Sequence, residues 1–261
     1  MNDSTKPESP FTREVVLQRP FQGQIQHQLA YDSAQCFDLY HGEGQSAPRP
    51  CVVFVCGFPD SGFRQLFGCS WKDTPPVTSW ARLFAASGIS VVTFQADNPV
   101  ADSCVLIDYL KANADSLNLD SRRLALWSCS GNVPAALAVL ERSPGIAAAT
   151  LLYGFMLEPE DDRFVSKAAE QFRFANPGVD GILFESAVNL LVVQAGKDEF
   201  PGVNKSIDYF LAQSAEQAVE VKLLRYENGV HAFDVMDDSA ESKAIVEQVI
   251  EFLLNALKPA H

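Results

Sequence analysis

A segment with two hydroxyl side chains on either side of a thiol, LWSCSGNVPAAL (126–137), could supply a nucleophile. Its first residues form a β-like run, and the alanine-rich residues after its glycine are typical of a helix. A nucleophile at such a turn can use the free N–H groups of the helix N-terminus to stabilise an oxyanion. The turn requires small residues two positions before and after the nucleophile, because the strand and helix backbones nearly touch there.

This steric requirement separates the two central candidates. With Cys129 as nucleophile, the position two residues earlier is Trp127, which is too large. With Ser130, that position is the small Ser128, and the position two residues later is Asn132, which is tolerable. The pattern therefore favours Ser130 as the nucleophile. A serine that only caps the helix is the alternative interpretation.

A serine nucleophile needs a histidine base that a carboxylate orients. The chain has four histidines, and His231, in ENGVHAFD (227–234), directly follows the last predicted strand. Asp198 follows the strand before it, in VVQAGKDEF (192–200), with Glu199 as an alternative acid. Ser130, Asp198 and His231 thus each follow a different strand, and we expect them on the same rim of the sheet.

The elements that would position these residues alternate along the chain. Runs of β-branched and other apolar residues predict strands at 51–56, 89–94, 123–128, 147–153, 189–195 and 219–226, with weaker candidates at 15–17 and 36–40. Helices are predicted at 78–88, 98–117, 132–140, 203–215 and 240–257. The alternation indicates an α/β fold: a mostly parallel central sheet with helices on both faces.

We expect one domain over residues 13–261, preceded by a flexible N-terminal tail over 1–12, because no change in composition divides the chain. Residues 155–188 interrupt the alternation with the acidic EPEDD (158–162) and a short helix-like piece. Two interpretations of this segment are open. It could be a cap or lid over a site, or a solvated helix and loop that returns to the sheet.

The composition argues against several classes of protein. The formal net charge is −13, so we predict no binding to nucleic acid or to an anionic membrane surface, which need clustered basic residues. No apolar run reaches the ~18 residues of a membrane span, and the first thirty residues lack the pattern of a signal peptide. Six scattered cysteines without metal-ligand spacing predict reduced thiols in a cytoplasmic protein, with no metal and no cofactor.

Four segments carry a resemblance to a known family: FVCGFP (54–59), LALWSCSGN (124–132), VVQAGKDE (192–199) and GVHAFD (229–234). They resemble α/β-hydrolases, especially the dienelactone hydrolase-like and carboxylesterase-like members, over about residues 51–257. The resemblance implies the α/β-hydrolase fold and a triad of Ser130, Asp198 and His231, in the chain order of that family. It also implies an oxyanion hole formed by the N–H groups of Phe58 and Gly131.

Two positions depart from that family's pattern. The predicted elbow reads Ser-Cys-Ser-Gly-Asn where Gly-x-Ser-x-Gly is common, and Cys56 replaces a histidine. Neither departure removes a catalytic group.

The sequence therefore predicts a serine hydrolase that cleaves a carboxylic ester, thioester or lactone of a small-molecule substrate through an acyl-enzyme. Gly57, Trp71 and Phe155 are candidates to line the substrate pocket. Two alternatives are open: a catalytically inactive hydrolase fold that binds a small ligand or a partner, and a Cys129-dependent enzyme of the dienelactone hydrolase type. The oligomeric state is not indicated.

Overall fold

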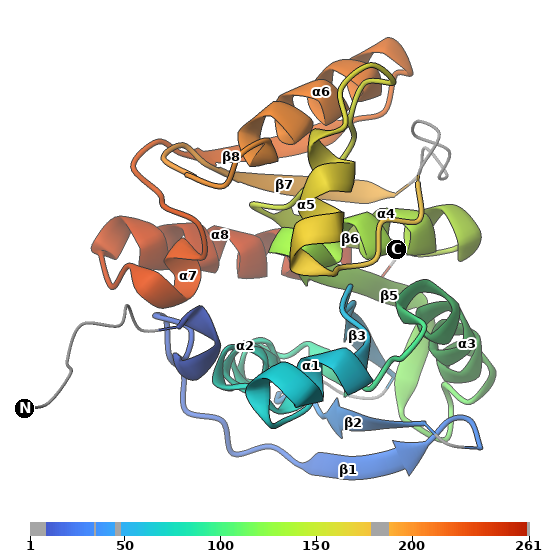
Figure 1. Cartoon of the computed structure of the whole chain (residues 1–261). Helices are drawn as coiled ribbons and strands as arrows, with labels where there is room; N and C mark the ends of the chain where they lie inside the picture. The colour runs from blue at the N-terminus through green and yellow to red at the C-terminus, as the bar shows by residue number, and fades with distance from the viewer. Residues whose placement is uncertain (1–8, 34, 45–47, 179–187, 260–261) are drawn as a thin grey trace, which may run out of the picture.

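The computed structural model describes residues 9–33, 35–44, 48–178 and 188–259. Its centre is an eight-stranded sheet in the order β1-β2-β4-β3-β5-β6-β7-β8, which runs from bottom to top in Figure 1. The six strands from β4 to the β8 edge pair in parallel. They are β3 (Arg49–Phe54), β4 (Ser90–Phe94), β5 (Leu119–Cys129), β6 (Ala148–Leu152), β7 (Asn189–Ala195) and β8 (Val221–Tyr226). An antiparallel pair completes the other edge: β1 (Ile25–Ala30) and β2 (Cys36–Tyr40).

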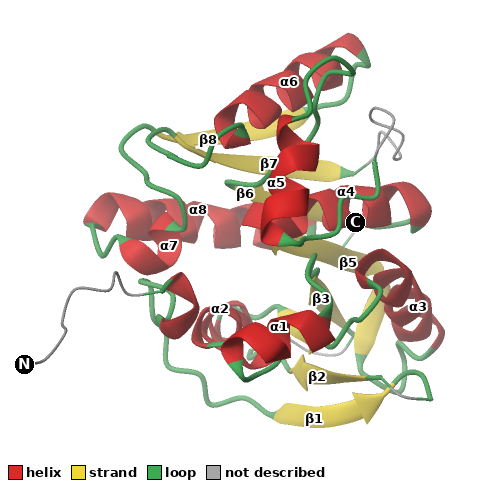
Figure 2. Ribbon diagram, in the orientation of Figure 1, coloured by secondary structure: helices red, strands yellow, loops and turns green. Residues whose placement is uncertain are grey.

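Helices cover both faces of this sheet (Figure 2). One face packs against α3 (Pro99–Ala112), α4 (Val133–Arg142) and α6 (Val203–Glu216). The opposite face packs against α2 (Pro75–Ala86), the short α7 (Phe233–Met236) and α8 (Ala240–Ala256). The predicted α/β class, with a mostly parallel sheet between two layers of helices, is therefore confirmed.

The strand sequences explain why the sheet lies between two cores. In β3, Cys51 and Val53 belong to one core while Val52 and Phe54 belong to the other, as the alternation of side chains along a strand requires. All four side chains are fully buried. Strands buried on both faces appear in the sequence as continuous apolar runs, which is why the central strands could be predicted.

The predicted strand at 15–17 is wrong. The segment is an irregular stretch bonded to α2 and α7: the Val15 N–H donates to Ser79 Oγ at 2.9 Å, and the Val16 N–H donates to the Asp234 carbonyl at 2.7 Å. Val15 is buried because these bonds hold it against the core, although it joins no sheet. Its apolar character therefore reflects tertiary packing.

Several elements near the site were not predicted, among them the 3-10 turns η1 (Pro10–Thr12) and η2 (Trp71–Asp73), the helix α1 (Asp60–Phe67) and the short helix α7. Residues 1–8 of the expected tail lie outside the described residues, whereas η1 occupies residues 10–12. In the segment 155–188, residues 155–178 contain α5 (Phe164–Phe172), and 179–187 lie outside the described residues. Within the described part of the chain, no helix is both long and apolar enough to cross a membrane.

Candidate active site

Ser130 lies on a sharp turn between β5 and α4, at the start of the 3-10 turn η3 (Ser130–Asn132). Its φ is +54°, which a residue with a side chain rarely adopts and which costs ~1–3 kcal/mol. The turn is packed backbone to backbone: a Cβ placed on Gly57 would lie 2.6 Å from the Gly131 carbonyl oxygen. A strained turn of this kind presents the serine Oγ at the carboxyl end of the sheet.

The Asn132 side chain forms hydrogen bonds that connect the turn at Ser130, the elbow, to the loop that follows β3. Its Oδ1 accepts a hydrogen bond from the Gly57 N–H at 2.7 Å, and its Nδ2 donates to the Cys129 carbonyl at 3.0 Å. Asn132 is buried, so both bonds are shielded from water. The asparagine that departs from the family pattern therefore joins the two segments that contain Phe58 and Ser130.

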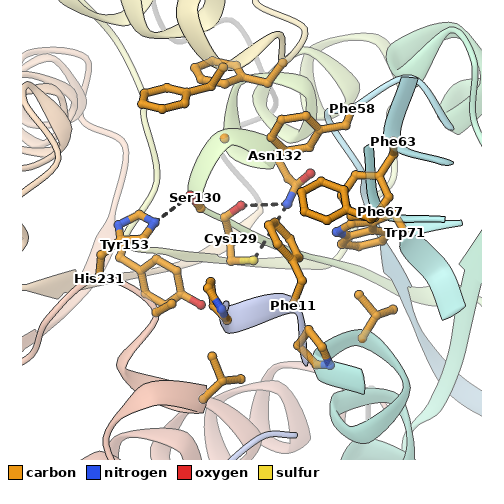
Figure 3. Close-up of a pocket in the computed structure, with 18 of the residues that line it drawn as sticks. Phe11, Phe58, Phe63, Phe67, Trp71, Cys129, Ser130, Asn132, Tyr153 and His231 are labelled. Carbon is orange, nitrogen blue, oxygen red and sulfur yellow. Dashed lines mark hydrogen bonds between the residues drawn. The ribbon is translucent and has the colours of Figure 1, made fainter. Parts of the chain in front are cut away.

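Ser130, His231 and Asp198 form a chain of two side-chain contacts. Ser130 Oγ lies 2.7 Å from His231 Nε2, and His231 Nδ1 lies 2.7 Å from Asp198 Oδ2 (Figure 3 shows the first contact). The Asp198 carboxylate is 0% exposed and accepts a further bond from the Phe200 N–H at 3.0 Å. Asp198 follows β7 and His231 follows β8, so the three side chains meet at the carboxyl ends of β5, β7 and β8.

Glu199, the alternative acid, is exposed to solvent, and Asp198 is the carboxylate that contacts the histidine. Two aromatic rings also pack on His231: the ring centroid of Tyr153 lies 5.0 Å from that of the imidazole, and that of Phe200 lies 4.4 Å away. These contacts, together with the Asp198 bond, fix the plane of the imidazole.

The two expected oxyanion donors lie on neighbouring segments. Gly131 follows Ser130 in η3, and a Cβ on Gly131 would lie 3.1 Å from the Phe58 ring. The Phe58 N–H donates to Cys56 Sγ at 3.4 Å. Sulfur is a weak acceptor, so this N–H can exchange its partner for an oxyanion at low cost.

Cys129 has different surroundings from its neighbour Ser130. The residue is half-buried, and its Sγ lies 3.9 Å from Asn132 Nδ2. Burial, together with the nearby Asp234 carboxylate, raises the pKa of the thiol to about 12. At neutral pH the thiol is therefore protonated, and the histidine contacts Ser130 instead.

A cavity of about 790 Å³ opens beside Ser130 and His231. Its walls are mainly apolar and rich in aromatic rings, many of which come from η1, α1, η2, α2 and the segment around α5 (Figure 3). Of the three expected pocket residues, Trp71 and Phe155 line it. Gly57 is not among its lining residues, because its backbone is packed between the elbow and the Ala175 N–H, which donates to the Gly57 carbonyl at 2.7 Å.

One buried carboxylate in this cavity was not identified from the sequence. Asp234 is 2% exposed and lines the wall. Its Oδ1 accepts from Tyr153 Oη at 2.6 Å, and its Oδ2 accepts from Trp80 Nε1 at 2.6 Å. The only sequence signal was its position three residues after His231, and its partners lie 81 and 154 residues away along the chain.

The described residues include no group of three or more histidine, cysteine, aspartate or glutamate side chains that could hold a metal ion. All six cysteines are free.

Neither a protein-family model nor a curated protein sequence matches the chain. Several solved structures match it along most of their length. A bacterial heroin esterase superposes with a TM-score of 0.66 at 15% sequence identity, covering 94% of this chain and 88% of that one. The esterase LipW from Mycobacterium marinum also has a TM-score of 0.66 at 15% identity, covering 91% and 83%.

MGS-M1, an alpha/beta hydrolase enzyme from a Medee basin deep-sea metagenome library, superposes with a TM-score of 0.66 at 16% identity, covering 91% of this chain and 99% of that one. These similarities confirm the α/β-hydrolase fold that the sequence resemblance implied. The narrower dienelactone hydrolase-like assignment stays a prediction.

Proposed function

We propose that this chain, which has the α/β-hydrolase fold, is a serine esterase with Ser130 as nucleophile, His231 as general base and Asp198 as the group that orients the histidine. The observation that carries the proposal is the pair of 2.7 Å contacts that joins these three side chains in sequence. A strained elbow holds the serine at one end of this relay, and a large cavity opens beside it. Structural neighbours that are named as esterases support an ester substrate.

In the proposed reaction, His231 Nε2 takes the hydroxyl proton as Ser130 Oγ attacks the ester carbonyl carbon. The C–O bond to the alcohol then breaks, and the imidazolium gives its proton to the leaving alcohol. A water molecule loses a proton to His231 and attacks the acyl-enzyme, and the acid leaves as the proton returns to Ser130. Asp198 stabilises the imidazolium formed in each half-reaction.

The Phe58 and Gly131 N–H groups would hold the negative oxygen of both tetrahedral intermediates. Removing one such donor costs ~3 kcal/mol in comparable sites. The same relay could also open a thioester or a lactone, because both present an acyl carbon to Ser130. The aromatic lining of the cavity favours a bulky apolar acyl or alcohol group.

Labelling with a fluorophosphonate and peptide mapping test the nucleophile directly. We expect a covalent adduct on Ser130 that is lost in Ser130→Ala and strongly reduced in His231→Ala. Hydrolysis of p-nitrophenyl butyrate should fall about 10³-fold or more in either variant. Cys129→Ala is the matched control and should keep both labelling and activity.

Hydrolysis that survives Ser130→Ala would contradict the mechanism. Loss of labelling in Cys129→Ala, with an adduct on the thiol, would favour the Cys129-dependent alternative. A folded protein that neither reacts with the probe nor hydrolyses esters would favour the inactive ligand-binding alternative.

A further inference from the structure

Asp234 is a buried carboxylate in the wall of the same cavity, and the proposed ester hydrolysis does not use it. Its two oxygens accept hydrogen bonds from Tyr153 Oη and from Trp80 Nε1. Burial raises the pKa of Asp234, while the hydrogen bonds from Tyr153 and Trp80 act in the opposite direction, so a cation bound beside the carboxyl group would favour its ionised form. Tyr153 also contacts the thiol of Cys129, the residue that precedes Ser130. Tyr153 therefore links the Asp234 carboxylate to the segment that contains the proposed nucleophile.

In the part of the chain that the structure describes, the Asp234 carboxylate has no lysine or arginine partner. Among the described residues, the only basic side chains that line the cavity are His231 and Arg173. Arg173 is exposed, so solvent screens its charge. Burying a carboxylate without a cation is costly, and two neutral donors offset only part of that cost.

The surroundings of Asp234 suit an organic cation better than a hydrated metal ion. The Tyr153 hydroxyl and the Trp80 N–H direct their polar edges at the carboxylate. The ring of Trp127, which packs on Trp80 with the centroids 5.4 Å apart, also lines the cavity. Aromatic rings attract cations through their negative faces, most strongly where water is excluded. A substituted ammonium group would satisfy both the carboxylate and the apolar walls.

We propose that the cavity recognises esters that carry a cationic ammonium group, with Asp234 as the counter-ion and the surrounding aromatic rings as the wall of the ammonium subsite. This inference rests on the proposed esterase function for the reaction, but the binding of the cation does not depend on it. The net charge of −13 would favour the approach of such a substrate.

A pair of esters with the same shape and different charge tests the proposal in the unmodified protein. Acetylcholine and 3,3-dimethylbutyl acetate differ by a quaternary nitrogen in place of a carbon atom. We expect kcat/KM for the cation to exceed that for the neutral ester by about tenfold, the factor that ~1.4 kcal/mol represents. Equal rates, or faster hydrolysis of the neutral ester, would overturn the proposal.

The variant Asp234→Asn keeps the size of the side chain and removes its charge. We expect it to lose about tenfold more in kcat/KM for the cation than for the neutral ester, so the ratio of the two rates falls towards one. Asp237→Asn is the matched control: it removes a negative charge three residues away, where Asp237 Oδ2 accepts from Tyr226 Oη at 2.6 Å outside the cavity. This control should keep the wild-type ratio.

A binding measurement separates failure of this proposal from failure of the proposed function. All three tryptophans of the chain, Trp71, Trp80 and Trp127, line the cavity, so their fluorescence reports on its occupancy. Phenyltrimethylammonium should quench it saturably in the wild type and in Ser130→Ala, with a Kd about tenfold weaker in Asp234→Asn.

Saturable quenching in a protein that hydrolyses no ester would support the cation site and contradict the esterase function. Ester hydrolysis without saturable quenching would support the esterase function and contradict the cation site. If Asp234→Asn does not fold, the comparison of the two esters in the wild type still decides the proposal.

Discussion

Cys129 and Ser130 are adjacent in the chain, yet burial and contacts give their side chains different reactivity. The thiolate is the reactive form of a cysteine, so a pKa of about 12 leaves very little reactive Cys129 at neutral pH. Because the folded pKa is raised, reactivity should increase with pH up to about 12. We predict that iodoacetamide alkylates Cys129 at pH 8 about 100-fold more slowly in the folded than in the denatured protein.

Mass spectrometry of the modified peptide over pH 7–10 measures this rate. An alkylation rate at Cys129 that reaches a plateau near pH 8 would show an activated thiol, and it would revive the Cys129-dependent alternative.

Asn132 is the side chain that connects the elbow to the loop containing Phe58. We predict that Asn132→Ala destabilises the protein by ~1–3 kcal/mol, because it leaves the buried Gly57 N–H without its acceptor. The activity should fall as well, since Gly57 directly precedes a proposed oxyanion donor. Urea unfolding and kcat measure the two effects.

Asn189→Ala is the control for this variant, because Asn189 Nδ2 also donates to a backbone carbonyl, that of Ala147, but at an exposed position. An Asn132→Ala protein as stable and as active as Asn189→Ala would mean that the elbow does not need this connection.

At the scale of elements, the turn η1 and the helix α1 together form one side of the cavity mouth. The Phe11 ring centroid lies 5.4 Å from that of Phe63 and 4.7 Å from that of Phe67. We predict that Phe11→Ala widens this side and shifts the preference towards longer acyl chains, because the ring occupies space that a chain could fill. The measurement is kcat/KM for p-nitrophenyl esters of increasing acyl length.

Phe21→Ala is the comparison, since the Phe21 ring packs near Tyr40 away from the cavity. It should leave the acyl-length profile unchanged. The same shift in both variants would point to a general loosening of the fold instead.

The sequence was sufficient to predict elements whose structure depends on residues close by in the chain. Strands such as β3 are buried on both faces and are therefore continuous apolar runs. The choice of Ser130 over Cys129 depended on neighbours two residues away, and the structure places Ser130 beside His231.

Elements held by distant contacts could not be predicted. Helix α1 depends on Phe63 packing against Phe11 and on Asp97, whose Oδ1 accepts from the Ser61 N–H at the first turn. Strand β1 has little apolar alternation, because it lies at the sheet edge with several exposed side chains. The contact of Asn132 with Gly57 and that of Asp234 with Tyr153 reach across 75 or more residues, and no spacing in the sequence indicates them.

At the scale of the whole molecule, a buried ion pair joins strand β2, in the antiparallel edge of the sheet, to the turn η2. Lys72 is 2% exposed, and its Nζ lies 2.8 Å from Asp38 Oδ2. Burial alone would raise the pKa of Asp38, but hydrogen bonds from Lys72 and from the Gln28 N–H hold that pKa below its usual value. A lowered pKa means that Asp38 stabilises the fold above the pKa of the unfolded chain, and that this contribution is lost as the pH falls through the folded pKa.

We predict that Lys72→Met lowers the free energy of unfolding by ~3–5 kcal/mol at pH 7, because the buried Asp38 carboxylate then keeps only the Gln28 N–H and His27 as partners. The deficit should shrink towards pH 4, as Asp38 takes up a proton. Urea unfolding at both pH values measures it. Lys243→Met, which removes the exposed pair with Asp238, should change the free energy by less than ~1 kcal/mol at either pH.

The division of the cavity between the two halves of the chain has a consequence for how such a protein can diversify. The proposed proton relay comes from the ends of β5, β7 and β8, whereas η1, α1, η2 and α2 build the opposite wall. Selection can therefore remodel residues 60–80, which follow the proposed Phe58 donor and lie outside the relay, to admit a new ester without altering either. A graft of this segment between homologous proteins would be expected to transfer the range of acyl and alcohol groups accepted, without a change in the order of bond making and breaking.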